Sequence, residues 1–156
     1  MSHLEVEAER VIAAKPEDVY AFLADYKERP KILPPNFSDY AVEEGGHGAG
    51  TVVSYRMRAG RRERLYRMRV DEPARGVLTE SDAGSSFATR WELSPTADGE
   101  RTRVRLASEW DGGSGVAGFF ERLFAPVGLR RIYNDMLARL AAAVEGSEHL
   151  RAETGE

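Results

Sequence analysis

The sequence contains no cysteine, which excludes disulfide bonds, thiolate catalysis and cysteine-ligated metal sites. Histidine is also scarce: His3 and His149 lie near the ends of the chain, and His47 lies in a glycine-rich turn. We do not expect them to form a nucleophile–base pair or a metal cluster, so we predict no bound metal. The sequence has no glycine-rich phosphate loop, zinc motif or hydrolase elbow, and we predict no cofactor.

Long hydrophobic runs are missing as well. Residues 1–10 contain no apolar run of signal-peptide type, and no stretch is long and apolar enough to cross a bilayer. We therefore expect a cytoplasmic protein without a transmembrane segment. The net charge of −4 argues against a nucleic-acid partner.

The positive charge is nearly all arginine and is concentrated in one stretch of the sequence. This stretch contains Arg56, Arg58, Arg61, Arg62, Arg64, Arg67 and Arg69. Because acidic residues are interspersed along the whole chain, we interpret the stretch as a solvated outer face of a sheet. An anion-binding surface is the alternative interpretation.

Length and composition indicate one globular domain. The chain has 156 residues, of which 42% are hydrophobic and 31% charged, as is typical of a single domain with a substantial core. We predict one domain over residues 1–146, whose last helix ends at Gly146. Residues 147–156 are predicted to form a disordered polar tail.

Seven short segments alternate apolar and polar residues, the pattern of half-buried β-strands. In the first, Leu4, Val6 and Ala8 alternate with glutamates. The other six lie around Tyr40 and Val42, Val53 to Met57, Tyr66 to Val70, Val77 to Ser81, Phe87 to Leu93, and Val104 to Trp110. Short turns join them, which favours antiparallel neighbours over crossover connections.

Two short helices and one long helix complete the order of elements. Pro16 suits the first position of a helix, and the prolines from Pro30 to Pro35 limit the next segment to a second short helix and a loop. After the last strand, apolar residues recur at helical spacing from Val116 to Val144. We expect this helix to kink between Pro126 and Gly128.

This order predicts an α+β fold. Four joins between elements carry a resemblance to a known family: residues 12–20 (IAAKPEDVY), 48–53 (GAGTVV), 70–73 (VDEP) and 98–102 (DGERT). They resemble the START/SRPBCC superfamily with the helix-grip fold, which includes pathogenesis-related plant allergens and a polyketide cyclase/dehydrase-like branch. These joins are landmarks of architecture and none is catalytic, so the resemblance leaves the chemistry open.

The resemblance implies a seven-stranded curved antiparallel sheet wrapped on the long C-terminal helix, with two short helices between strands 1 and 2. The first and last strands are expected to be neighbours. Glu5, Glu7 and Glu9 would then lie beside Arg103 and Arg105 on the outer face, as favourable cross-strand pairs.

Between the sheet and the long helix we expect a cavity for a small molecule. The candidate ligand-binding residues face inward from the strands or lie at the start of the long helix: Tyr55, Met57, Tyr66, Met68, Thr89, Trp91, Ser108, Trp110, Phe119, Phe120, Leu123 and Phe124. Leu33 and Phe37 are expected at the opposite lip. The alternative is that the aromatic residues simply fill the core.

Arg10 is a further candidate for the cavity. Strict alternation places it on the inward face with Val6 and Ile12, where a charge requires a partner or a ligand. It would pair with Glu80 or a helix acid, or bind a ligand carboxylate or phenolate, unless a β-bulge turns it outward.

Two kinds of polar group are candidates for chemistry in this cavity. Tyr55 and Tyr66 are candidate hydrogen-bond donors to a bound carbonyl or hydroxyl group. Glu80 and Asp82 are the nearest carboxylates for general acid–base work, although Glu80 would equally suit the edge of the sheet.

Three functions fit these observations. We favour binding or transport of a small hydrophobic ligand, lipid-like or aromatic. The second is a polyketide cyclase or dehydratase, in which Arg, Tyr, Ser or Thr groups polarise carbonyls. The third is a protein-interaction module, for instance a homodimer through the segment from Val116 to Leu129.

The interior discriminates between these three functions. A closed apolar cavity of roughly a few hundred cubic ångströms favours the carrier. Convergent Arg and Tyr groups with water between them favour the enzyme. A filled interior contradicts both of these functions and favours the interaction module.

Overall fold

The computed structural model describes residues 3–59, 62–111 and 126–154, without the side chains of residues 59, 62, 126–127 and 146–154. The elements are β1 (His3–Ile12), α1 (Pro16–Ala24), the 3-10 turn η1 (Arg29–Ile32), β2 (Phe37–Glu44), β3 (Val52–Ala59), β4 (Arg62–Ala74), β5 (Val77–Asp82), β6 (Ala88–Pro95), β7 (Thr102–Asp111) and α3 (Pro126–Thr154). The predicted α+β order is confirmed. The second predicted short helix is a single 3-10 turn, because Pro30 lies at its start and Pro34 and Pro35 follow closely, which leaves no room for a longer helix.

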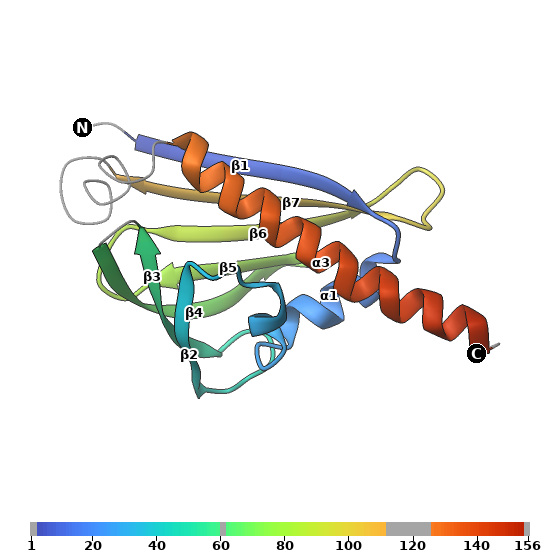
Figure 1. The fold of residues 1–156 in the computed structure, drawn as a ribbon, viewed down its shortest axis with the longest axis horizontal. Helices are drawn as coiled ribbons and strands as arrows, with labels where there is room; N and C mark the ends of the chain where they lie inside the picture. The colour runs from blue at the N-terminus through green and yellow to red at the C-terminus, as the bar shows by residue number, and fades with distance from the viewer. Residues whose placement is uncertain (1–2, 60–61, 112–125, 155–156) are drawn as a thin grey trace.

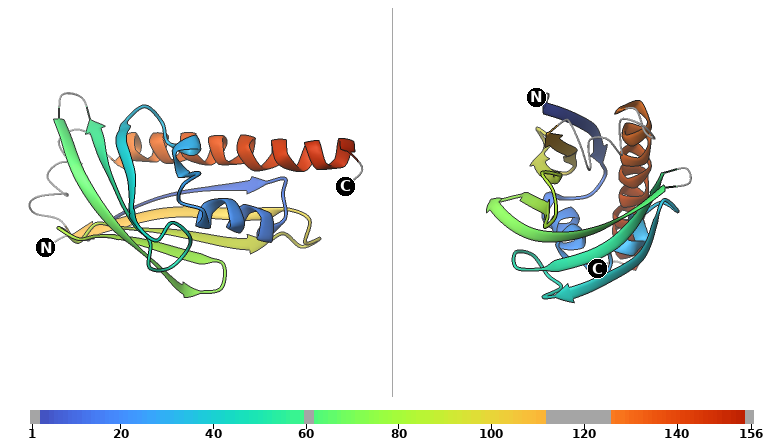
Figure 2. Two further views of the ribbon diagram at one scale, coloured as in Figure 1. Left: turned by 90° about the horizontal axis from the view of Figure 1, so that it is seen from below. Right: turned by 90° about the vertical axis from the view of Figure 1, so that its left-hand side faces the viewer.

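The strands form one seven-stranded antiparallel sheet in the order β1-β7-β6-β5-β4-β3-β2. Consecutive strands from β2 to β7 are neighbours, while β1 lies beside β7 at one edge. The sheet curves, and α3 crosses its concave side (Figures 1 and 2). This arrangement is the predicted sheet wrapped on a C-terminal helix.

The pairing of β1 with β7 confirms the predicted neighbours. Glu9 lies opposite Arg105 in the register, and Glu5 lies opposite Glu109. Arg105 contacts Glu5 at 3.2 Å and also pairs with Glu7, while Arg103 contacts Glu9 at 2.6 Å. Exposed pairs of this kind contribute about 0.2–1 kcal/mol each, so they fix the register more than they stabilise the fold.

The outward arginines of β3 and β4 are paired with acidic residues. Arg56 contacts Asp39 at 3.1 Å, and Arg58 contacts Glu63 at 3.0 Å. Arg67 contacts Glu43 at 2.7 Å. These pairs support the interpretation of a solvated face and leave less free positive charge for an anion.

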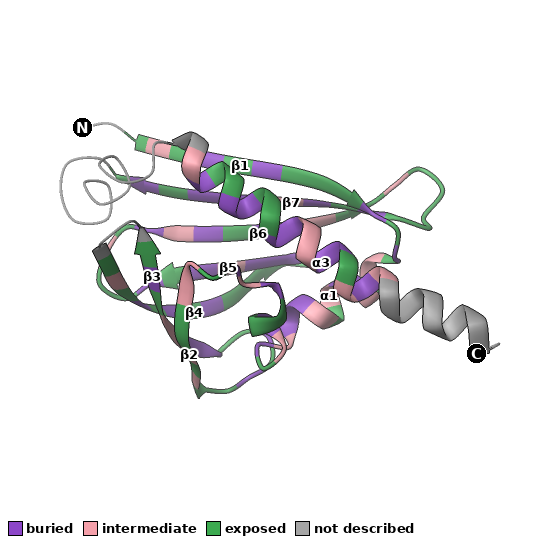
Figure 3. Ribbon diagram, viewed as in Figure 1, coloured by how far each residue is buried: buried purple, intermediate pink, exposed green. Residues whose placement is uncertain are grey.

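The helix α3 covers the sheet with one apolar stripe, which Figure 3 shows as a line of buried positions. The buried residues of the stripe are Leu129, Ile132, Tyr133, Met136, Leu137, Leu140, Ala141 and Val144. Their spacing of three and four residues is that of one helix face. Near the end of the stripe, the backbone N–H of Ala13 donates a hydrogen bond to Oε2 of Glu145 at 2.8 Å, which ties α3 to the end of β1.

The bounds of α3 differ from the prediction at its C-terminal end. The helix continues through Gly146 to Thr154, so the predicted stop at Gly146 is wrong. The predicted disorder of residues 147–156 stays a prediction. A glycine inside a helix costs about 1 kcal/mol relative to alanine, and the strong helix formers on both sides of Gly146 offset that cost. The helical segment predicted before Pro126 lies outside the described residues. The kink predicted between Pro126 and Gly128, where α3 begins, therefore stays a prediction.

Pro126 occupies the first position of α3 as the structure describes it, where a missing N–H costs nothing. Within the described part of the chain, no helix combines the length and the apolar character that crossing a membrane requires.

Candidate functional site

A narrow cavity lies between α3, η1, β2 and the inner face of the sheet. Aromatic side chains dominate its wall: Phe37, Tyr40, Tyr55, Phe87, Trp91 and Tyr133. Leu33, Val53, Met57 and Met136 add aliphatic surface, and Arg29, Glu80 and Thr89 add polar groups. The solvent-accessible volume is about 30 Å³, which is room for about two water molecules. A larger ligand therefore enters only if side chains of the wall move.

Several of the residues predicted for the cavity lie in this wall. Tyr55, Met57, Thr89 and Trp91 line the cavity, as do Leu33 and Phe37 from the predicted lip. The remaining strand candidates are buried in the core outside the described wall: Tyr66, Met68, Ser108 and Trp110. Four helix candidates, Phe119, Phe120, Leu123 and Phe124, lie outside the described residues, as does most of the segment from Val116 to Leu129.

Arg10 does not line the cavity, which corrects the expectation from strict alternation. The register pairs Arg10 with Val104 and shows no bulge, so both residues belong to the inner face. Val104 is buried, but the Arg10 side chain is exposed. Because β1 is an edge strand, a long side chain at this position reaches solvent past the edge of the sheet.

A buried ion pair forms the charged centre of the cavity. Nη1 of Arg29 donates to Oε2 of Glu80 at 2.7 Å, and the hydroxyl of Tyr26 donates to the same oxygen at 2.6 Å. Nη2 of Arg29 donates to the carbonyl of Leu23 at 2.9 Å. Burial acts to lower the pKa of Arg29, but the Glu80 carboxylate raises it, and the net result lies above the usual range. The two side chains therefore carry opposite charges, and the net charge of the pair is zero.

Aromatic rings fix the position of the guanidinium group. The central carbon of Arg29 lies 4.4 Å from the ring centre of Tyr26 and 5.1 Å from that of Trp91. Cation–π contacts of this kind are stronger when the cation is desolvated. Arg29 is held by stacking as well as by hydrogen bonds.

Two N–H groups of the wall have unused donor capacity. Among the described residues, Nε of Arg29 and Nε1 of Trp91 are buried without a hydrogen-bond partner. A buried donor without an acceptor costs about 1–3 kcal/mol. An oxygen acceptor in the cavity would recover part of that cost.

A chain of hydroxyl groups connects three elements beside the cavity. Oγ1 of Thr89 and Oγ of Ser108 lie 2.6 Å apart, and Ser108 is also hydrogen-bonded to the hydroxyl of Tyr133 on α3. Burial raises the pKa of Tyr133 to about 12, although hydrogen bonds from Ser108 and Thr89 act to lower it. Tyr133 is therefore a neutral phenol at pH 7, able to donate or accept a hydrogen bond.

The two candidate carboxylates have separate places in the structure. Glu80 is part of the cavity wall, whereas Asp82 lies outside that wall as described. Asp82 accepts hydrogen bonds from the Ser85 hydroxyl at 2.6 Å and from the backbone N–H of Arg67 at 3.2 Å. It holds a turn of the chain in place.

Several residues of the wall were not named as candidates from the sequence. Arg29 lies in a polar stretch without periodicity, so no pattern marked it as buried. Tyr40 follows Asp39, whose φ of 54° accompanies a bulge in β2 that breaks simple alternation. Tyr133 did carry a signal, because it is a polar-tipped residue within the predicted apolar stripe of the helix.

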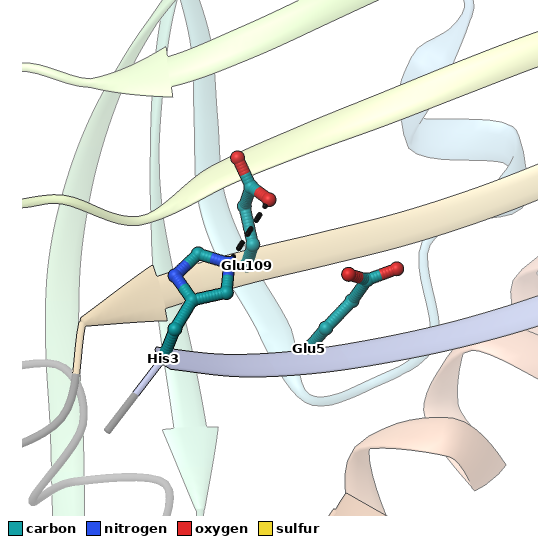
Figure 4. A group of neighbouring side chains, drawn as sticks. All are labelled: His3, Glu5 and Glu109. Carbon is teal, nitrogen blue, oxygen red and sulfur yellow. Dashed lines mark hydrogen bonds and ion pairs between the residues drawn. The ribbon is translucent and has the colours of Figure 1, made fainter.

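The histidine prediction needs one correction on the outer face of the sheet. His3, Glu5 and Glu109 come together with their potential ligand atoms within 4.8 Å of one another (Figure 4). The antiparallel register of β1 and β7 produces this proximity. All three residues are exposed, and Nε2 of His3 lies 3.2 Å from Glu109 while Nδ1 lies 3.3 Å from Asp111. Hydrogen bonds to Asp111 and Glu109 raise the pKa of His3, as expected for an exposed ion-pair cluster.

Comparisons with known proteins agree with this architecture. A family model described as polyketide cyclase / dehydrase and lipid transport matches residues 3–145. A search of curated proteins gave no match. Among solved structures, the KanY protein is 39% identical in sequence, with a TM-score of 0.81 over 93% of this chain and 99% of that chain.

Two more distant structures share the fold. The Zhui aromatase/cyclase from Streptomyces sp. R1128 is 22% identical, with a TM-score of 0.67 over 97% of this chain and 96% of that chain. Norcoclaurine synthase from Thalictrum flavum, in complex with dopamine and hydroxybenzaldehyde, is 14% identical. Its TM-score is 0.70 over 93% of this chain and 88% of that chain.

Proposed function

The chain belongs to the polyketide cyclase / dehydrase and lipid transport family, and we propose that it binds a small aromatic molecule in the cavity beneath α3. The observation that carries the proposal is the cavity wall, which combines aromatic rings with Arg29 and Trp91, two residues whose Nε and Nε1 atoms are buried without a hydrogen-bond partner. Apolar walls with a few placed polar groups are typical of small-molecule sites. The structures that share the fold support it, because one is an aromatase/cyclase and another binds dopamine and hydroxybenzaldehyde.

Ring contacts indicate how an aromatic ligand is accommodated. Phe37 and Tyr55 contact each other with ring centres 5.3 Å apart, and Tyr40 stacks on Tyr55 at 6.4 Å. A planar aromatic ligand would exchange these ring–ring contacts for contacts between a ring and the ligand, at a small cost in free energy. Tyr40 and Tyr55 are partly exposed, so they are the side chains that we expect to move when the cavity opens.

Tryptophan fluorescence tests the proposal directly. Trp91 lines the cavity and Trp110 lies outside the described wall. Titration with 2-naphthol is expected to quench the fluorescence of the Trp110→Phe variant, in which Trp91 remains, to a saturable end point. The Trp91→Phe variant is the matched control and should show a much smaller change. Equal quenching in both variants, or none, would contradict binding at this site.

A second candidate function, a cyclase or dehydratase, is favoured by one further observation. A carboxylate, Glu80, and a neutral phenol, Tyr133, line the same cavity. In a dehydration, Glu80 would accept the proton of a C–H bond as the C=C bond forms. The C–O bond would break, and Tyr133 would protonate the leaving hydroxyl to give water. Ser108 and Thr89 would hold the Tyr133 hydroxyl in position.

The two candidates make different predictions for the same variant. If the protein is a binder, Tyr133→Phe should change the affinity for an aromatic ligand by a small factor and nothing else. If it is a dehydratase, the same variant should keep its affinity for a β-hydroxyketone and lose at least about a hundredfold in turnover. Mass spectrometry of the reaction mixture measures the loss of water.

A further inference from the structure

We infer that the buried pair of Glu80 and Arg29 makes the cavity selective for uncharged ligands, with Glu80 as the specificity-determining residue. The inference rests on the proposed ligand-binding function. Among the described residues of the wall, Arg29 is the one cation and Glu80 the one anion. Their charged atoms lie 2.7 Å apart, so the site is neutral before a ligand enters.

The hydrogen bonds of the pair leave no free charge for an anionic ligand. Glu80 receives donors from both Arg29 and Tyr26, and the second terminal nitrogen of Arg29 is bound to the carbonyl of Leu23. A ligand carboxylate would enter a desolvated site beside Glu80 without a counter-charge of its own. Burial of an uncompensated charge is strongly unfavourable.

The remaining hydrogen-bond capacity suits a neutral oxygen. Nε of Arg29 and Nε1 of Trp91 are both donors, and both are buried without a partner among the described residues. The Arg29 guanidinium lies over the Trp91 ring, with its central carbon 5.1 Å from the ring centre. A ketone, an ester or a phenol offers the acceptor that these donors lack and adds no charge. The ligand class is therefore an uncharged oxygen-bearing aromatic molecule, and fatty acids and aryl carboxylates are excluded.

Three ligands with the same ring system test the charge selection: 2-naphthol, 2-acetylnaphthalene and 2-naphthoate. At pH 7 the first two are neutral and the third is an anion. We expect the wild-type protein to bind each neutral ligand at least about tenfold more tightly than 2-naphthoate, as measured by calorimetry.

The Glu80→Gln variant should reduce or remove this preference. The glutamine keeps the shape of the side chain and an oxygen that accepts from Tyr26, but it leaves Arg29 without its counter-charge. We expect 2-naphthoate to bind this variant at least about tenfold more tightly than it binds the wild type. Glu92→Gln is the matched control, because it removes the same charge from a partly exposed site outside the described wall, and its preference should equal that of the wild type.

Each outcome decides the inference. Equal or tighter binding of 2-naphthoate by the wild type, or an unchanged preference in Glu80→Gln, would overturn the charge selection while leaving the proposed function intact. Failure of all three ligands to bind the wild type would count against the proposed function itself. If Glu80→Gln does not fold, the double variant Arg29→Gln/Glu80→Gln is used, which is neutral like the wild type. It must still prefer the neutral ligands, and a preference for 2-naphthoate would overturn the inference.

Discussion

Glu80 and Arg29 are joined by a 2.7 Å contact in which the two side chains are only 9% and 4% exposed. Their attraction has to offset the cost of removing both charges from water, so such a pair adds little net stability. Breaking it is different, because one charge then stays buried alone. Removal of one side chain of the pair is therefore expected to destabilise the fold more than removal of both.

We predict that Arg29→Met lowers the free energy of unfolding by about 3–5 kcal/mol, the usual cost of leaving one buried charge unpaired. The double variant Arg29→Met/Glu80→Met should lose less than Arg29→Met alone, because no charge then remains in the cavity. Urea denaturation of the three proteins measures the difference. A loss for the double variant as large as that for Arg29→Met alone, or larger, would contradict the coupling of the two side chains.

The hydroxyl chain makes a second prediction. Ser108→Ala removes the group that joins Thr89 and Tyr133, and it should cost about 1–3 kcal/mol because buried hydroxyls lose a partner. Ser94→Ala is a matched control on the exposed part of β6 and should change stability by less than about 0.5 kcal/mol. Thermal unfolding of both variants gives the comparison. A loss for Ser108→Ala no greater than that of the control would contradict the chain.

Alkaline pH should unfold this protein cooperatively. Burial is the first cause of a raised pKa at every tyrosine in the sequence: Tyr20, Tyr26, Tyr40, Tyr55, Tyr66 and Tyr133. An unfolded tyrosine has a pKa of about 10, so above that pH the folded state holds more protons than the unfolded state. The stability from each residue is fully present below pH 10 and is lost as the pH rises through the folded pKa, which is about 12 for Tyr133.

Two measurements check the pH prediction together. Tyrosinate absorbance at alkaline pH should rise in the same narrow range in which circular dichroism reports unfolding. The variant Tyr133→Phe should lose stability less steeply above pH 10, since it has one fewer titrating group. A tyrosinate signal that rises smoothly from about pH 10 without unfolding would contradict the burial of these side chains.

A fourth prediction compares two glycines in one turn. Gly48 has φ +63° and Gly50 has φ +89°, so alanine is strained at either position. At Gly48 the new Cβ would also lie 2.3 Å from Oε1 of Glu72, whereas at Gly50 nothing lies within 4 Å. Oε1 of Glu72 accepts the backbone N–H of Ala49 at 3.1 Å, and this hydrogen bond would be displaced.

We therefore expect Gly48→Ala to cost about 1 kcal/mol more than Gly50→Ala, the value of the lost hydrogen bond. Chemical denaturation of the two variants measures this difference without a correction for backbone strain, which both share. Equal losses would show that Glu72 rearranges freely.

The strands were predictable because alternation is a local property. Tyr55, Met57, Thr89 and Trp91 were assigned to the cavity from spacing alone, and all four line it. Alternation failed at Arg10, where the position of β1 at the edge of the sheet decides exposure. The edge position of β1 is a property of the strand order in the sheet, and it cannot be predicted from the residue spacing within one strand.

The charged centre was not predictable from local pattern. Arg29 is buried because Glu80 lies opposite it, and the two residues are 51 positions apart in the chain. The position of Tyr40 in the wall depends on a bulge at Asp39. Asp39 is a non-glycine residue with positive φ, and no turn motif in the sequence predicts it. The sequence therefore indicated the apolar wall of the site together with Thr89 and Glu80, while the pairing of Glu80 with Arg29 depended on tertiary contacts.

The pairing of β1 with β7 also determines the order in which the protein is able to fold. His3 and Asp111 are partners in the register, although they are 108 positions apart in the chain. The strands β2 to β7 can form hairpin by hairpin as they leave the ribosome, whereas β1 precedes them in the chain and pairs only with the last strand, β7. Contacts between such distant residues form slowly. We expect the docking of β1 to be the final step of folding, and an undocked β1 to be the form of the chain most exposed to aggregation and to chaperones.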